Sequence, residues 1–370
     1  MSNANSSTLY IGLMSGTSAD AIDVALVNIE GEAIQLIDFI TQPNHYQATL
    51  ATLNQQPNIS LHQLAEFQVQ IAQDFALAAN SMMTKHQLDR KDIRAIGSHG
   101  QTLFHAPDIG MSIQAGHPAI IAKQSGITTA ADFRIDDMAL GGQGAPLAPA
   151  FHQALLRPTS PTLLINIGGI ANISYLQPNK PPLGFDSGPG NGLMDELCQS
   201  AFNRPYDANG ELAKQTPPDS AILEHLLTER YFQQAPPKST GRETFNQAWL
   251  QKQLKAEITT NITPLTLLST LNQLTVDALA NDIDKLDCPD QTVCYICGGG
   301  AYNLTLLERL QARLPQLRIQ TTQQLGIDPN AIEAMMCAWL AHNRIHEIET
   351  PLAAITGAQK NTVLGGVWLA

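Results

Sequence analysis

Apolar residues recur along this chain in short runs separated by polar, glycine-rich turns. Residues 8–40 hold three such runs and predict three consecutive β-strands. Residues 61–88 space their apolar side chains by three and four, which predicts an amphipathic helix. Residues 93–97 and 127–131 predict further strands, with a helix over 118–125 between them. Strands joined through helices in this way indicate an α/β layer.

The second half of the chain repeats the opening arrangement of strand, glycine-rich turn and strand. Residues 163–167 predict a strand that enters Gly168-Gly169, and residues 173–176 predict the strand that leaves it. The other expected elements are a short strand over 184–186, a helix from 193, mostly helical structure over 205–290, strands over 292–297 and 318–321, and a helix over 330–346. The two halves therefore share one plan.

Charge and composition exclude several classes of protein. The formal net charge of -12 argues against a nucleic-acid or anionic-membrane partner, although ATP can still be held by local N–H groups and a metal. No apolar run approaches the roughly 18 residues of a membrane span, and the first residues lack the layout of a signal peptide. We therefore expect a cytoplasmic protein. Cys294 and Cys297 lie three apart on an expected strand, where their thiols diverge, so we expect core cysteines.

The stretch Gly12 to Asp23, GLMSGTSADAID, places small polar residues between two apolar runs. The N–H and hydroxyl groups of such a turn can close on a phosphate, and a plain surface hairpin is the alternative. A Walker P-loop sequence is absent, as is the protein-kinase set of motifs. Residues 188–193 partly match the GxGxxG fingerprint of dinucleotide-binding proteins, but Leu193 occupies its third glycine position.

Two α/β halves with one phosphate-sized turn each resemble the actin-like ATPase superfamily of sugar kinases, acetate kinases and actin. Within it, the stretches GTSADAID, SHGQT, DFR with GGQGAPL, NIGGIAN, FDSGPGN, PKSTGRE and CGGGAYN resemble the 1,6-anhydro-N-acetylmuramic acid kinase family over essentially the whole chain. One departure is in the first turn, which usually reads GTSLDGID. Ala19 and Ala21 replace Leu and Gly here, and we expect altered packing rather than lost activity.

The resemblance implies an α/β protein with a two-domain actin-like (ribonuclease H-like) ATPase fold and a cleft between the domains. We expect an N-terminal domain of residues 1–131 plus about 350–370, and a C-terminal domain of residues 132–349. The polar, glycine-rich segment from Asp132 to Pro146 is the expected junction. A chain of 370 residues is long enough for two cores.

The implied activity is ATP-dependent opening of the 1,6-anhydro bridge with phosphorylation of O6, in cell-wall (peptidoglycan) recycling. The implied ligands are an amino sugar, ATP and Mg²⁺, and the implied assembly is a homodimer. Two alternatives stay open from the residues alone. One is another actin-like sugar or acyl kinase, and the other is a nucleotide-dependent assembly or sensor protein.

Asp186 is the expected catalytic residue. It ends a strand beside a Gly-Pro-Gly turn and a helix N-terminus, which would place a carboxylate among unpaired N–H groups. The local pattern fits a turn or capping aspartate equally well, and the resemblance makes it the general base. One carboxylate suffices if the departing O6 is captured by the γ-phosphoryl group, because the base then only activates water at the anomeric carbon.

The expected ATP-binding residues lie in three turns. They are Gly16, Thr17, Ser18, Ala19, Asp20, Ala21, Ile22 and Asp23 in the first, Asn166, Gly168, Gly169 and Asn172 in the second, and Gly298, Gly299, Gly300 and Asn303 on the adenosine side. Asp20 and Asp23 are candidate Mg²⁺ ligands through water, and turn capping is the equally good alternative.

The expected sugar-binding residues are His99, Gln101, Arg134, Gln143 and Glu333. His99 and Gln101 follow a strand end, where loops carry function. Arg134 could fork to the carboxylate of the lactyl group, or it could be a surface salt-bridge partner. Glu333 could hold sugar hydroxyls, or it could simply complement a helix dipole.

Overall fold

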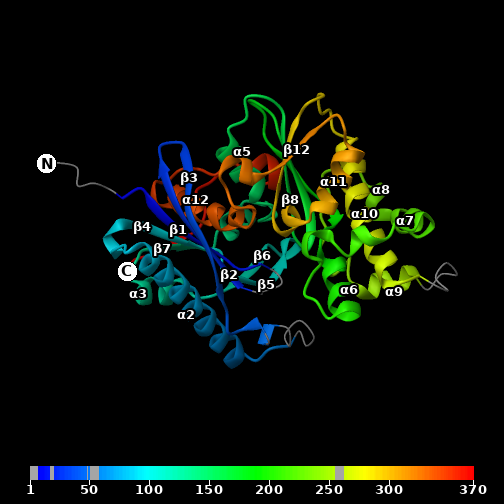
Figure 1. Cartoon of the computed structure of the whole chain (residues 1–370). Helices are drawn as coiled ribbons and strands as arrows, with labels where there is room; N and C mark the ends of the chain where they lie inside the picture. Colours follow the sequence, from blue (N-terminus) through cyan, green and yellow to red (C-terminus); the bar gives the residue numbers. More distant parts are fainter. Residues whose placement is uncertain (1–6, 17–20, 48, 51–57, 255–261) are drawn as a thin grey trace. The chain divides into compact units, whose positions relative to one another are not determined.

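The structure is a computed structural model that describes residues 7–16, 21–47, 49–50, 58–254 and 262–370 (Figure 1). The chain forms two compact units. The first unit consists of Met1–Leu156 and Ala331–Ala370, and the second of Arg157–Asn330. The first unit thus includes residues 132–156 and 331–349, which we expected from the sequence to belong to the C-terminal domain. The reason is packing, since helix α12 (Ile332–Ile345) lies on strands of the first sheet.

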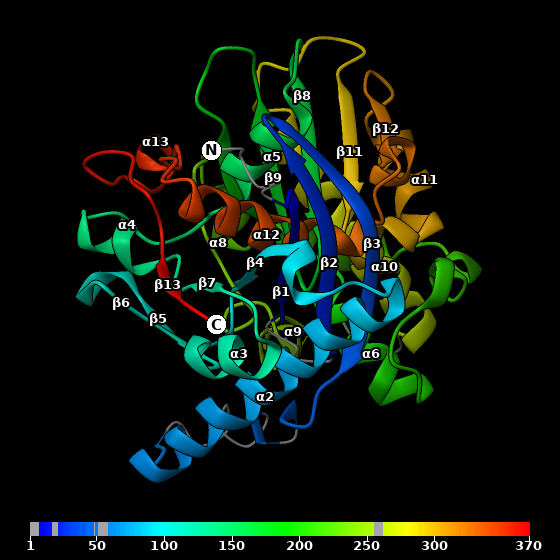
Figure 2. The same cartoon turned by 90° about the vertical axis from the view of Figure 1, so that its left-hand side faces the viewer.

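The first unit is built on a six-stranded sheet in the order β13-β7-β4-β1-β2-β3. Its strands are β1 (Leu9–Met14), β2 (Ala21–Glu30), β3 (Ala33–Pro43), β4 (Ile93–Ser98), β7 (Thr129–Ala131) and β13 (Gly366–Trp368). A separate hairpin consists of β5 (Gln101–Ala106) and β6 (Met111–Ala115), and the other helices are α2 (Leu61–His86), α3 (Pro118–Ser125), α4 (Ile135–Ala139), α5 (Ala148–Leu156) and α13 (Ala353–Thr356). Figure 2 shows the long β2–β3 hairpin beside β1.

Helices cover both faces of this sheet, because its strands carry apolar side chains on both sides. Ile11 and Leu13 of β1 pack with buried residues of α2 on one face. Gly12, which points the other way, lies under α12, and its register partner Gly97 on β4 does the same. A Cβ atom at either glycine would overlap a backbone carbonyl of α12, that of Ala334 or Cys337. The two glycines therefore let a helix backbone rest directly on the sheet.

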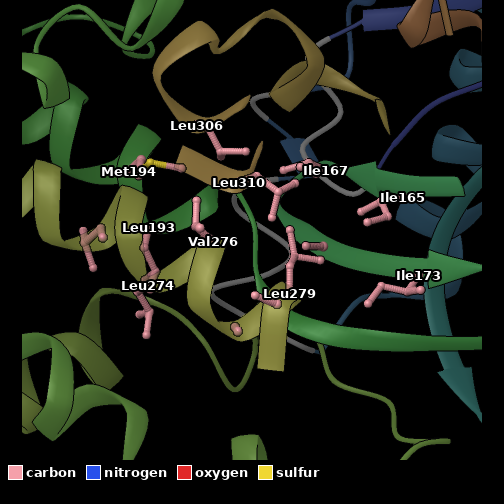
Figure 3. Close-up of a cluster of buried hydrophobic side chains, with 14 of the residues drawn as sticks. Ile165, Ile167, Ile173, Leu193, Met194, Leu274, Val276, Leu279, Leu306 and Leu310 are labelled. Atoms are coloured by element: carbon pink, nitrogen blue, oxygen red, sulfur yellow. The ribbon is translucent and has the colours of Figure 1, made fainter. Parts of the chain in front are cut away.

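The second unit has a five-stranded sheet in the order β10-β9-β8-β11-β12. Its elements are β8 (Thr162–Ile167), β9 (Ile170–Leu176), β10 (Leu183–Pro189), β11 (Val293–Cys297), β12 (Arg318–Thr321), α6 (Gly192–Phe202), α7 (Ser220–Leu227), α8 (Arg230–Gln233), α9 (Gln247–Leu254), α10 (Pro264–Ile283) and α11 (Leu304–Arg313). Ile165, Ile167 and Ile173 of the sheet pack against residues of α10 and α11, including Leu279 and Leu310 (Figure 3).

Both sheets follow one topology. In each, three antiparallel strands in chain order are followed by two parallel strands added beside the first, as in β3-β2-β1-β4-β7 and β10-β9-β8-β11-β12. This repeated order is that of the ribonuclease H-like fold, so the expected fold class is confirmed. The expected cleft between the two domains stays a prediction.

Two further expectations concern cysteines and membranes. Cys294 and Cys297 are both buried on β11, which confirms the core interpretation of that pair. Within the described ranges, no helix combines the length and the apolar character that crossing a bilayer requires.

Candidate active site

The second glycine-rich turn of the chain, Gly168-Gly169, is braced by the start of α6. The N–H of Asn191 donates to the carbonyl of Gly168 at 2.7 Å, and the N–H of Gly190 donates to that of Gly169 at 3.0 Å. A Cβ atom at Gly192 would lie 2.9 Å from the Gly169 carbonyl oxygen. A side chain at position 192 would therefore press on the Gly169 carbonyl and disturb the turn.

The third turn, Gly298 to Gly300, lies against the end of β8. The register of β11 and β8 pairs Cys297 with Asn166, just before both turns begin. Gly298 has a φ of +73°, and a Cβ atom there would overlap the side-chain oxygen of Asn166. The structure thus brings the second and third predicted turns together, at the carboxyl ends of neighbouring parallel strands.

Asn303 has a different contact from the one expected of an adenosine ligand. Its side-chain oxygen accepts a hydrogen bond from the N–H of Leu306 at 3.0 Å, which makes it the N-cap of α11. The Asn303 side chain is buried and serves as a helix cap in this structure.

Asn166, Asn172 and Asp186 form a polar row across three strands. Asn166 is opposite Asn172 on β8 and β9, and Asn172 is opposite Asp186 on β9 and β10. Residues opposite one another on antiparallel strands share one sheet face, with Cβ atoms about 4.5–5.5 Å apart. The adjacent residues Ile173 and Phe185 belong to the apolar core on the other face. The strand register therefore presents two amides and one carboxylate together.

The Asp186 carboxylate is held by residues 238–240, here called the clamp segment. Its Oδ2 atom accepts hydrogen bonds from the Ser239 hydroxyl at 2.9 Å and from the Thr240 N–H at 3.1 Å. The Asp186 N–H donates to the carbonyl of Lys238 at 2.9 Å. Burial raises the pKa of Asp186, and the bonds from Thr240 and Ser239 act to lower it. A carboxylate fixed in this way suits a general base.

The clamp segment is anchored by a buried ion pair. Lys238 Nζ lies 2.9 Å from Asp282 Oδ2, and both side chains are almost completely buried. The same oxygen accepts a hydrogen bond from the hydroxyl of Ser187, the residue after Asp186, at 2.9 Å. Breaking a buried pair by removing one partner is costly, which keeps the clamp in one position. Asp282 thereby ties the clamp to the strand that it serves.

The first glycine-rich turn is described only at its two ends, because Thr17, Ser18, Ala19 and Asp20 lie outside the described residues. On the entering side, Ser15 accepts a hydrogen bond from the Tyr46 hydroxyl at 3.0 Å, and the amide of Gln101 donates to the Gly16 carbonyl at 3.2 Å. On the leaving side, Ala21, Ile22 and Asp23 are already part of β2, and the Ile22 side chain is in the core.

Half-buried Arg134 and buried His99 form a polar cluster in the first unit. Arg134 donates to His99 Nε2 from Nε at 3.3 Å and from Nη2 at 3.1 Å, and Nη1 donates to the Gly144 carbonyl at 2.9 Å. His99 Nδ1 lies 3.1 Å from the Gly100 carbonyl, which can only accept, so Nδ1 carries the proton. Arg134 is therefore a half-buried cation whose guanidinium is oriented by His99 and by the Gly144 carbonyl.

Glu333 and Gln143 lie near this cluster in different ways. Burial lowers the pKa of Arg134, and the charge of Glu333, in the first turn of α12, opposes that change. Gln143 is exposed, and its N–H donates to the Thr356 carbonyl at 3.1 Å. Buried Asp137 fixes the loop that contains Gln143, because its carboxylate accepts a hydrogen bond from the Gly144 N–H at 2.7 Å. Of the five expected sugar ligands, His99 and Arg134 are in direct contact.

Two fully buried histidines of the first unit should make its stability depend on pH. Burial lowers the pKa of His99 and of His152 to about 3, from an ordinary 6.5. Between these values the unfolded chain binds protons that the folded chain does not, so stability is complete above pH 6.5 and decreases as the pH falls towards 3. We expect denaturant titration to give a lower free energy of unfolding for the first unit at pH 5 than at pH 7.5.

A matched pair of variants checks the cause of that pH dependence. His152→Phe removes one buried titrating group. It should therefore reduce the difference in free energy of unfolding between pH 5 and pH 7.5. His62→Phe changes a histidine whose side chain is 84% exposed and should leave the difference as it is. An unchanged difference in His152→Phe would show that this histidine is not responsible.

Several residues of the site carry little sequence signal. Lys238, Ser239 and Thr240 lie some fifty positions from Asp186, and Asp282 lies on a helix that reads simply as amphipathic. Tyr46, whose pKa burial raises to about 12, gives no hint of its bond to Ser15. The stretch PKSTGRE was the one available signal, because it stands out as a polar segment after two prolines.

Comparison with known proteins gives a consistent result. A family model described as Anhydro-N-acetylmuramic acid kinase matches residues 8–370. A curated relative with that name from Hydrogenovibrio crunogenus is 51% identical over 364 residues, covering 98% of each chain. Another, from Shewanella sp. (strain ANA-3), is 46% identical and covers 96% of this chain and 97% of its own. Among solved structures, an activator of 2-hydroxyisocaproyl-CoA dehydratase from Clostridium difficile with bound ADPNP has a TM-score of 0.47 at 10% identity, with 92% and 96% coverage.

Proposed function

Because this chain belongs to the anhydro-N-acetylmuramic acid kinase family, we propose that it uses ATP to open the 1,6-anhydro bridge of anhydro-N-acetylmuramic acid and to phosphorylate O6. The products are N-acetylmuramic acid 6-phosphate and ADP. The observation that carries the proposal is the position of Asp186, clamped through Oδ2 and aligned with Asn166 and Asn172 beside the second turn.

In this proposal Asp186 is the general base. It takes a proton from the water that attacks the anomeric carbon, and the bond from that carbon to O6 breaks. The departing O6 attacks the γ-phosphorus of ATP, and the bond from phosphorus to the bridging oxygen of ADP breaks. Phosphorylation replaces the proton that an acid would otherwise give to the leaving oxygen, so a second carboxylate is unnecessary. The clamp segment sets the orientation and the pKa of this base.

We assign the phosphates and adenosine of ATP to the three turns. The residues are Gly16 to Asp23, then Asn166, Gly168, Gly169 and Asn172, and then Gly298, Gly299, Gly300 and Asn303. Backbone N–H groups in small-residue turns suit an anion. A Cβ atom at Gly298 or Gly300 would overlap Asn166 or Ile167, so glycine at both positions keeps the third turn packed closely against the end of β8.

A magnesium ion fits the donors that the first turn offers. Mg²⁺ usually takes one or two carboxylates together with substrate phosphates. Asp23 provides a half-buried carboxylate on β2, and Asp20 lies outside the described residues. Within the described part of the chain, no group of three His, Cys, Asp or Glu side chains could hold a metal. We assign Mg²⁺ to Asp23 and Asp20 through water, where it would neutralise phosphate charge.

The sugar is assigned to His99, Gln101, Arg134, Gln143 and Glu333. Arg134 has N–H groups beyond those given to His99 and Gly144, and a guanidinium can bind the lactyl carboxylate through two parallel hydrogen bonds. Gln101 has a buried side-chain oxygen that meets no partner among the described residues, so it can accept from a sugar hydroxyl. We further propose a cytoplasmic homodimer that acts in peptidoglycan recycling, without a nucleic-acid or membrane partner.

Product analysis in ¹⁸O-labelled water tests this function. We expect mass spectrometry to find one label at the anomeric hydroxyl of a 6-phosphosugar, since water attacks carbon. Label in free phosphate would mean that water attacks phosphorus instead. Turnover with a free hydroxyl sugar and none with the anhydro sugar would favour another sugar kinase. ATP-dependent polymerisation without a phosphosugar would favour an assembly protein.

A further inference from the structure

Arg242 lies directly beside the second turn. A Cβ atom built on Gly169 would be 3.3 Å from Arg242 Cδ and 3.9 Å from its Nε. The arginine stem therefore covers the open side of this glycine, only two residues beyond the clamp segment that holds Asp186. One short stretch of chain thus reaches both the expected base and the expected phosphate turn.

The guanidinium of Arg242 makes one hydrogen bond among the described residues. Its Nη2 atom lies 2.6 Å from Oε1 of Glu196 on α6, and the arginine side chain is 36% exposed. Four of its five N–H donors have no bond among the described residues. The other carboxylate oxygen of Glu196, Oε2, is buried and has no partner there either. A single bond to an acid holds the cation near Gly169 without using up its donors.

Two other cations of the second unit are already committed to buried partners. Lys238 is paired with Asp282 in the interior. Arg309 donates to the carbonyls of Ser269 and Ala213 and to two further side-chain oxygens. Neither can turn to a ligand without leaving buried groups unpaired, which is expensive. Arg242 differs because it can change partner at the cost of one partly exposed ion pair.

We propose that Arg242 binds the transferred phosphoryl group, and that Glu196 holds it in place until nucleotide arrives. This inference rests on the function proposed above. As the bond from phosphorus to the bridging oxygen of ADP breaks and the bond to O6 forms, negative charge spreads over the three non-bridging oxygens. Arg242 donates hydrogen bonds to those oxygens and takes part in no proton or electron transfer. A planar fork of donors suits this role better than a lysine would.

Steady-state kinetics of Arg242→Ala and Arg242→Lys test the proposal. We expect kcat to fall by about 10²- to 10³-fold in Arg242→Ala, below the largest effects known for such arginines, with a KM for the sugar close to that of the parent. Added guanidinium ion should restore part of the rate in Arg242→Ala. Arg242→Lys should recover only a fraction, because it keeps charge and loses the fork.

Arg313→Ala is the matched control. Arg313 is another half-exposed arginine of the second unit, with one acidic partner, Asp284, at 2.9 Å. We expect it to keep the parent kcat. If Arg242→Ala folds like the parent and retains its kcat, Arg242 does not bind the phosphoryl group. The ¹⁸O assay on the parent protein separates this failure from failure of the proposed function, because it reports the reaction without any variant.

Discussion

Replacing Asp186 with asparagine should abolish both ring opening and ATP turnover. Asparagine keeps the size of the side chain and can still accept the bonds from Ser239 and Thr240, but it cannot take a proton from water. General bases contribute about 10²- to 10⁴-fold to enzyme rates, so we expect a loss of at least that order. Because O6 becomes free to attack ATP only when the ring opens, both products should disappear together. Chromatography of the phosphosugar and a coupled ADP assay measure the two.

Controls for this prediction come from the same unit. Asp290→Asn changes an exposed aspartate before β11, at the end opposite Gly298, and should leave the rate unchanged. Ser239→Ala removes a hydrogen bond that lowers the pKa of Asp186, so the acid limb of the kcat profile should move to higher pH. Product formation by Asp186→Asn near the parent rate would rule out Asp186 as the base, provided that thermal unfolding shows both proteins intact.

Gly97→Val should cause a large loss of stability in the first unit. A Cβ atom at Gly97 overlaps the carbonyl oxygen of Cys337, which is helix backbone and cannot rotate away. Overpacking a core usually costs about 1–3 kcal/mol, and a clash with backbone exceeds what side chains alone produce. We expect urea unfolding to show a loss at or above the top of that range. α12, which carries Glu333, should shift away from β4.

Arg94→Val provides the comparison on the same strand. Arg94 is exposed, so the same new side chain there meets solvent and should change stability by no more than about 0.5 kcal/mol. If Gly97→Val and Arg94→Val unfold at the same urea concentration, α12 does not rest on the sheet backbone at Gly97.

The sequence predicts the elements of this fold better than their grouping. The local spacing of apolar residues is enough to predict the strand around Asp186 and the helix over 330–346, because each element depends only on residues within its own segment. The position of that helix in the first unit depends on Gly12 and Gly97, whose small size has meaning only once β1 and β4 are adjacent. Charge patterns were equally ambiguous, since nothing local distinguishes buried Lys238 from a surface lysine.

The site shows the same limit. Asp186 can be found because a strand, a turn and a helix start coincide at it. Its partners cannot, because the clamp reaches it through tertiary contacts across some fifty residues. For Asn303 the sequence pattern predicts an adenosine-binding turn, and the structure shows that this residue caps the helix that follows.

The first unit is assembled from both ends of the chain, with the second unit inserted between them. During synthesis on the ribosome, residues 157–330 are therefore complete before the helix that covers β1 and β4 has been made. At roughly 5–20 residues per second, the nascent β1 and β4 wait on the order of tens of seconds for that cover. Until α12 emerges, the glycine-lined face of the first sheet is an exposed surface that a chaperone can bind.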